Sequence, residues 1–228
     1  HFRAIATPVD ETQFRKHLAG KALDKLKQEE GTAGGEGDLH IRFVAPPLRR
    51  TFMQEEKGDV GKVEIEAPVA FTDVLADDAN LILYAKPEYG RTSLLRELRY
   101  QLLAKVETIR FPRLPVMIDF ADITSNVDRM LRLVRGRAEE TPDGNDLESL
   151  LKLGHACVLV DDVHFSDRRR MKILRDFVER FPKARYILSS PQHSATQQGA
   201  CVDPEMPVRF EFVEVRELRR NDMRQLLT

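Results

Sequence analysis

Three consecutive residues have the types and spacing of a phosphate-binding loop. Gly90, Arg91 and Thr92 follow an apolar run, and Ala85 stands five positions before Gly90. The usual pattern is G-x-x-x-x-G-K-[ST], in which backbone N–H groups surround the phosphates, the lysine reaches the terminal phosphate and the hydroxyl group binds magnesium. Here alanine replaces the first glycine and arginine replaces the lysine. The pattern predicts a weakened nucleotide site, although a tight turn followed by a helix capped by Thr92 would use the same residues.

The residues on either side of this motif complete the predicted nucleotide site. We expect Tyr89 and Ser93 to contact the nucleotide together with Ala85, Gly90, Arg91 and Thr92. An arginine keeps the positive charge of the missing lysine, but its planar guanidinium group has a different shape from a compact ammonium group. We therefore expect phosphate binding to survive the replacement better than phosphoryl transfer.

Two carboxylates end a second apolar run, about 70 residues after the loop. Asp161 and Asp162 follow "CVLV", and ligands of open α/β sheets bind at the carboxyl ends of the strands. Magnesium is often held by one or two carboxylates together with water and phosphate oxygens. We predict that Asp161 and Thr92 bind Mg²⁺ and that Asp162 is the catalytic base or orients a water molecule. The alternative is a polar turn whose acids are solvated or cap the helix that starts near Asp167.

Two further groups of residues admit more than one interpretation. Ser189 ends a third apolar run, which would place it near the terminal phosphate, but Ser-Ser-Pro is also common turn chemistry. Arg168, Arg169 and Arg170 form a basic run on a predicted helix. We interpret that run as a solvated face, with an intersubunit arginine finger or a nucleic-acid contact as the alternative.

Strand-like and helix-like segments alternate from about residue 71 onward. The predicted strands are 80–85, 114–120, 156–162, 184–190 and 208–215, and the predicted helices are 92–106, 126–138, 146–154 and 167–181. This alternation predicts an α/β fold in which helices cover both faces of a mostly parallel sheet. In the part of the chain that precedes residue 71, we expect a helix within 10–30, a glycine-rich loop at 31–38 and an irregular charged segment at 45–62.

The composition limits the classes of partner. Hydrophobic residues make up 42% of the chain, charged residues make up 32%, and the net charge is −1, so nothing global favours nucleic acid as a partner. No apolar run approaches the roughly 20 residues that span a bilayer, so we expect no membrane as a partner. The two cysteines give no disulfide framework, and a reducing, cytoplasmic compartment is the expectation.

The order of these motifs resembles the STAND class of P-loop NTPases, the AAA-related signalling ATPases that include the NACHT proteins. Residues 81–98 resemble their Walker A segment, with two departures, while 157–167 resemble Walker B and 184–190 resemble the sensor strand. The resemblance implies a three-layer α/β/α P-loop core over 71–217 with five parallel strands. It also implies an N-terminal helical and linker region over 1–70 and the start of a truncated helical domain at 218–228.

The same resemblance implies a nucleotide-gated switch. In that class, ADP holds a closed monomer, ATP with a trigger permits self-association, and many bacterial members act in anti-phage defence or transcriptional control. The replaced glycine and lysine imply that this chain binds ATP or ADP but hydrolyses it weakly or not at all. The alternative is a degenerate module that binds no nucleotide and serves as a platform for oligomerisation or interaction.

Overall fold

The computed structural model describes residues 43–55, 62–105, 110–138, 147–197, 200–202 and 204–218. The helix expected within 10–30, the glycine-rich loop and the helix expected at the end of the chain lie outside these residues.

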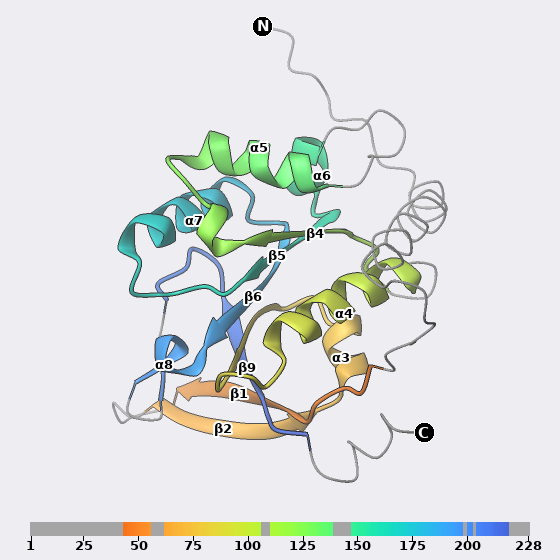
Figure 1. Cartoon of the computed structure of the whole chain (residues 1–228), viewed down its shortest axis with the longest axis vertical. Helices are drawn as coiled ribbons and strands as arrows, with labels where there is room; N and C mark the ends of the chain where they lie inside the picture. Colours follow the sequence, from red (N-terminus) through yellow and green to blue (C-terminus); the bar gives the residue numbers. More distant parts are fainter. Residues whose placement is uncertain are drawn as a thin grey trace, which may run out of the picture.

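One mixed sheet runs through the middle of the described chain (Figure 1). Its strand order is β2-β1-β9-β3-β6-β5-β4, and a separate two-stranded sheet pairs β7 with β8. The five strands from β9 to β4 are parallel, whereas β1 is antiparallel to both β2 and β9. The strands are β1 (Leu48–Glu55), β2 (Lys62–Val69), β3 (Asn80–Ala85), β4 (Leu114–Asp119), β5 (Ala156–Asp161), β6 (Arg185–Pro191), β7 (Thr196–Gln197), β8 (Ala200–Cys201) and β9 (Phe210–Val215).

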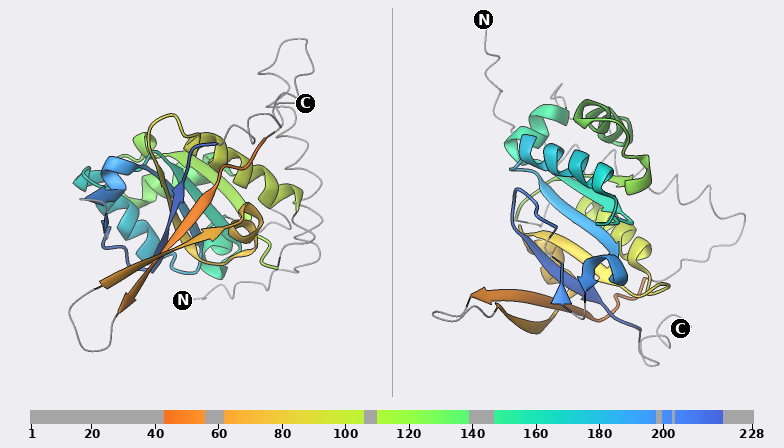
Figure 2. Two further views of the ribbon diagram at one scale, coloured as in Figure 1. Left: turned by 90° about the horizontal axis from the view of Figure 1, so that it is seen from below. Right: turned by 90° about the vertical axis from the view of Figure 1, so that its left-hand side faces the viewer.

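The first two strands correct the sequence analysis. All five predicted strands are present and parallel, but the sheet has seven strands, so the predicted count of five was wrong. The segment 45–62 was predicted to be irregular because it is charged and contains proline, yet it includes β1. Arg50 in this strand forms ion pairs with Asp77 at 2.6 Å and with Glu211 at 3.4 Å, and Thr51 is buried. The charge of Arg50 therefore has partners elsewhere in the fold. In Figure 2 the β1–β2 pair extends away from the rest of the sheet.

Helices cover both faces of the parallel part of the sheet. One face carries α3 (Phe71–Ala76) and α4 (Arg91–Ala104), and the other carries α5 (Val127–Arg137), α6 (Leu147–Leu153) and α7 (Arg168–Arg180). A short 3-10 helix, η2 (Phe120–Asp122), follows β4, and α8 (Gln192–Ala195) follows β6. No helix among the described residues is both long enough and apolar enough to cross a membrane.

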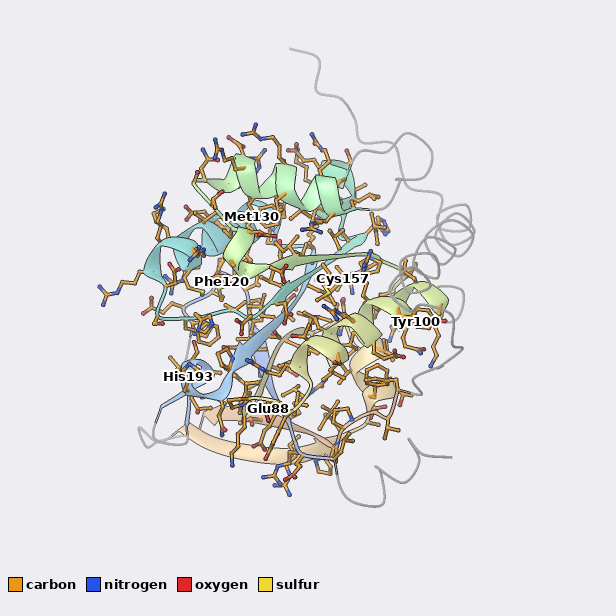
Figure 3. All side chains as sticks on the ribbon, viewed as in Figure 1. Glu88, Tyr100, Phe120, Met130, Cys157 and His193 are labelled. Atoms are coloured by element: carbon orange, nitrogen blue, oxygen red, sulfur yellow. The ribbon has the colours of Figure 1, made fainter. Side chains whose placement is uncertain are left out.

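The side chains of β5 alternate between two apolar clusters. Cys157 and Leu159 pack in the cluster that contains the buried leucines of α4, while Val158 and Val160 pack with α5, α6 and α7. Figure 3 shows Cys157 near the middle of the sheet and Met130 of α5 among the side chains between that helix and the sheet. Both sides of the strand are fully buried, which explains its continuous apolar sequence.

The connections bring the ends of four parallel strands to one edge. After β3 the chain crosses through α4 to β4 at the far edge, and β5 and β6 then fill the space between them. Because these strands are parallel, the ends of β3, β6, β5 and β4 all lie at the carboxyl edge of the sheet. This is the edge at which doubly wound sheets bind their ligands.

Candidate functional site

The loop between β3 and α4 depends on a left-handed glycine. Gly90 has φ 75° and ψ 27°, and its carbonyl oxygen accepts the first helical hydrogen bond from the N–H of Leu94 at 2.8 Å. Glu88, two residues earlier, also has a positive φ of 68°. A residue with a side chain is disfavoured in this conformation, so the glycine is required by the turn into α4.

The start of α4 has no side-chain cap. In α5, the side chain of Asn126 accepts a hydrogen bond from the N–H of Arg129, and in α7 Asp167 does the same for Arg170, both at 3.0 Å. Gly90 occupies the equivalent position in α4 and has no side chain to offer. The first N–H groups of α4 therefore keep the partial positive charge that attracts an anion.

Arg91 connects this loop to the end of β5. Its Nη2 lies 3.5 Å from Oδ1 of Asp162, although the two residues are 71 positions apart in the chain. The Arg91 side chain is 17% exposed and the Asp162 side chain is 60% exposed. The Nη1 atom of Arg91 is buried and has no hydrogen-bond partner. The guanidinium group thus has an unused donor at the junction between the loop and the two acids.

Ser189 holds the two acids at the end of β5. It is completely buried, and its hydroxyl group donates a short hydrogen bond to Oδ1 of Asp161. The same hydroxyl oxygen accepts from the backbone N–H of Asp162 at 2.9 Å, and that N–H also lies 3.0 Å from Asp161 Oδ1. Asp161 is buried, whereas Asp162 adopts a left-handed conformation with φ 55° and points its other oxygen to Nε2 of His164 at 3.3 Å.

The remaining predicted site residues lie around the loop with different degrees of exposure. Ala85 is buried at the end of β3, in register with Pro191 of β6. Tyr89 is half-buried and packs against the apolar cluster that contains α4. Thr92 is half-buried in the first turn of α4, and Ser93 beside it is exposed. Hydrogen bonds join Arg91, Asp161, Asp162 and Ser189 into one group. Among the described residues, none of these bonds includes Tyr89, Thr92 or Ser93.

A cavity of about 400 Å³ opens beside the two acids, at the ends of β4 and β5. It is lined by Asp119, Phe120, Ala121, Asp122, Asp161, Asp162, His164, Asp167 and Arg170. Asp119 lies directly opposite Asp161 in the pairing of β4 with β5. Sequence reasoning did not select Asp119, although the same pattern of a carboxylate at the end of an apolar run would have identified it.

Arg170 closes one side of this cavity. Its guanidinium group lies 2.5 Å from Oδ2 of Asp167 and donates to the carbonyl oxygen of Ala121 at 3.3 Å. The hydrogen bonds from the Arg170 backbone and side chain also hold the pKa of Asp167 below its ordinary value. Arg170, which was assigned only to a basic run, therefore ties the start of α7 to η2.

The residues at this edge fit a nucleotide with magnesium in part. The uncapped start of α4 and the unused donor of Arg91 suit a phosphate group. In the part of the chain that the structure describes, no three histidine, cysteine, aspartate or glutamate side chains group closely enough to hold a metal ion by themselves. Magnesium bound with a nucleotide takes most of its ligands from water and phosphate, and Thr92 and Asp161 are the groups on this edge that would add to them.

Comparison with known proteins finds similarity among solved structures but not among family models or curated proteins. No protein-family model matches the chain, and no curated protein matches it. One similar solved structure is that of AMPPCP-bound DnaA from Aquifex aeolicus, with 18% sequence identity and a TM-score of 0.35. The match covers 54% of this chain and 37% of the DnaA chain.

Proposed function

We propose that this chain is the nucleotide-binding module of a STAND-type signalling switch, which binds ATP or ADP and hydrolyses it weakly or not at all. The observation that carries the proposal is the approach of Arg91 to Asp162, because it joins the glycine loop to the acidic end of β5 at one sheet edge. The STAND assignment, with its trigger-dependent self-association and its setting in bacterial anti-phage defence, rests on the resemblance of the motifs.

The nucleotide phosphates would occupy the start of α4. Phosphate oxygens would accept hydrogen bonds from the first N–H groups of the helix and from the guanidinium group of Arg91, whose Nη1 lacks a partner. Thr92 and Asp161 would hold magnesium, and Asp162 would orient water. Tyr89 and Ser93 flank the loop and would contact the nucleotide from either side.

The same geometry supports weak turnover. Arg91 lies against Asp162, so the cation that should neutralise charge on the transferring phosphate shares its charge with the proposed base. The removal of one such electrostatic contact typically costs a few kcal/mol in the transition state. Ala85, in place of the first glycine, is buried in the strand end and adds a Cβ there.

Calorimetry with ATP, ADP and magnesium tests nucleotide binding. We expect heat of binding at micromolar to millimolar nucleotide, and we expect Arg91→Ala to weaken binding at least tenfold. Arg96→Ala is the matched control, because Arg96 lies on the same helix and is exposed. The absence of heat at millimolar nucleotide would end the proposal.

One observation favours a second candidate function, that of an interaction platform without nucleotide. Arg91 already pairs with Asp162, and Tyr89 packs into the apolar cluster, so side chains of the loop itself engage the surroundings of the phosphate position. A platform should self-associate without nucleotide, which sedimentation velocity measures. Concentration-dependent oligomers that ATP and ADP leave unchanged would favour this candidate over the switch.

A further inference from the structure

The helices α5 and α7 carry a strong excess of positive charge. Together they contain ten arginines and lysines but only three carboxylates, whereas the whole chain has a net charge of −1. These two helices pack side by side over the same face of the sheet, opposite α4 (Figure 1). The excess charge is therefore concentrated in one layer of the molecule and is not spread over its surface.

Half of these basic residues already have acidic partners. Arg170 pairs with Asp167, Lys172 with Asp176, and Arg180 with Asp128 and Glu148. Arg137 and Arg175 lie 3.5 Å and 3.8 Å from Asp122 and Glu205. The charges of these five basic residues are therefore balanced in part by neighbouring acids.

Five arginines remain exposed with no carboxylate among the described residues within ion-pair distance. They are Arg129, Arg132, Arg135, Arg168 and Arg169, and we call them the basic face. Arg129 approaches a neutral group, the hydroxyl of Ser125, at 3.4 Å. Figure 3 shows nitrogen-tipped side chains projecting outward from α5, away from the sheet.

A groove lies between the start of α5 and α7, beside the basic face. It has a volume of about 530 Å³ and is lined by residues 125–128 at the start of α5 and by Arg169, Lys172, Ile173, Asp176 and Arg180 of α7. Arg169 thus lies at the groove beside Ser125, which Arg129 contacts from the other helix. Of the basic face, Arg169 of α7 lines this groove, and Arg129 of α5 reaches it through Ser125.

We propose that the basic face binds the phosphate backbone of a double-stranded nucleic acid. All five unpaired cations are arginines, whose fork of donors matches phosphate oxygens better than the ammonium group of lysine does. Single strands are usually held by stacking bases on aromatic side chains, and the aromatic residue of α5 and α7, Phe177, is fully buried. A duplex needs only phosphate contacts, and it supplies one negative charge for about every 1.7 Å of its axis. This proposal stands independently of nucleotide binding at the loop.

Fluorescence anisotropy with a labelled 20-base-pair duplex of arbitrary sequence tests the proposal. We expect binding at 50 mM NaCl that weakens steeply with salt, with a logarithmic slope of about −4 to −5 if five phosphates are neutralised. The double variant Arg132→Ser/Arg168→Ser should lose at least tenfold in affinity and reduce the slope by about 2. Binding should be the same with and without ATP.

The matched control is Arg96→Ser/Arg209→Ser, which removes the same charge from exposed positions outside α5 and α7. Its affinity for the duplex should lie within about threefold of that of the wild-type chain. Circular dichroism should show that both double variants are folded. Equal losses of duplex affinity in the two double variants would show that the duplex responds to positive charge anywhere on the protein, and would overturn the proposal. So would the absence of binding at 50 mM NaCl. A polyglutamate peptide that binds as tightly as the duplex would assign the face to an acidic protein instead.

Discussion

Ser189 and Asp161, on the neighbouring strands β6 and β5, share a buried hydrogen bond at the edge of the candidate site. Sequence reasoning placed Ser189 near the terminal phosphate, whereas its hydroxyl group here contacts the carboxylate of Asp161 and the backbone N–H of Asp162. Ser189 is therefore a positioning residue in this structure, because it holds the carboxylate of Asp161 and the backbone of Asp162.

Replacement of Ser189 by alanine should destabilise the fold. The change leaves a buried carboxylate oxygen with one partner fewer and deletes an acceptor of the Asp162 N–H. The loss of a buried hydrogen-bond partner costs about 1–3 kcal/mol, and urea unfolding followed by circular dichroism measures it. Ser93→Ala, at an exposed position, is the control and should change the free energy of unfolding by less than about 0.5 kcal/mol. Equal stability of the two variants would show that the Ser189 hydroxyl does not support Asp161.

Replacement of Arg91 by lysine should strengthen nucleotide binding. A lysine restores the usual residue of the phosphate-binding pattern and removes the guanidinium group that lies 3.5 Å from Asp162. We expect about a tenfold gain in ATP affinity by calorimetry, which corresponds to about 1.4 kcal/mol.

The control for this exchange is Arg96→Lys, which makes the same chemical change at an exposed position of α4 and should leave ATP affinity unaltered. If Arg91→Lys also leaves the affinity and the turnover unaltered, the arginine is not the only departure that weakens the loop, and the buried Cβ of Ala85 becomes the next position to change.

Sequence predicts best the elements whose apolar side chains follow one local pattern along the chain. Strand β5 is apolar on both faces because it lies between two layers of helices, and its hydrophobic run identifies it without further information. Strand β1 escaped prediction because the ion pairs of Arg50 with Asp77 and Glu211 are long-range. A local pattern of charge and proline cannot show that such partners exist.

At the candidate site too, sequence predicted the local backbone but not which strands are neighbours. The pattern around Gly90 indicated a turn into a helix, and Gly90 has the required left-handed backbone. The position of Asp119 opposite Asp161 follows from the pairing of β4 with β5, and the insertion of β6 between β3 and β5 follows from the strand order. Periodicity determines which segments are strands but carries no information about which strands are neighbours, so sequence reasoning could not supply either relationship.

The charge of Asp167 should make stability depend on pH. The backbone and side-chain hydrogen bonds from Arg170 lower the pKa of this carboxyl group below its ordinary value of 3.8. A group with a lowered pKa in the folded state contributes stability above its unfolded pKa, and that contribution disappears as the pH falls through the folded value. Asp167→Asn keeps an N-cap for α7 but removes the charge.

We therefore expect Asp167→Asn to be less stable than the wild-type chain at pH 7 by a few tenths of a kcal/mol, since the ion pair is partly exposed. The difference should shrink when the pH is lowered below about 4. Urea unfolding at pH 7, 5 and 3 measures it. A difference that stays constant over this range would mean that the charge of Asp167 contributes nothing to the free energy of unfolding.

Two glycine-to-alanine changes should have opposite effects on stability. At Gly90 an added Cβ would meet no heavy atom within 4 Å, so any cost comes from the backbone, whose φ of 75° disfavours a side chain by about 1–2 kcal/mol. At Gly136, within α5, an added Cβ also meets nothing within 4 Å, and φ lies outside the left-handed range. Gly136→Ala should therefore stabilise the chain by up to about 0.5 kcal/mol, because alanine favours helix over glycine and Gly136 lies in the last turn of α5. Thermal unfolding of both variants measures whether each change lowers or raises the stability of the chain. If Gly90→Ala were also stabilising, the turn into α4 would not need its left-handed residue, and the match of this loop to the phosphate-binding pattern would lose its structural basis.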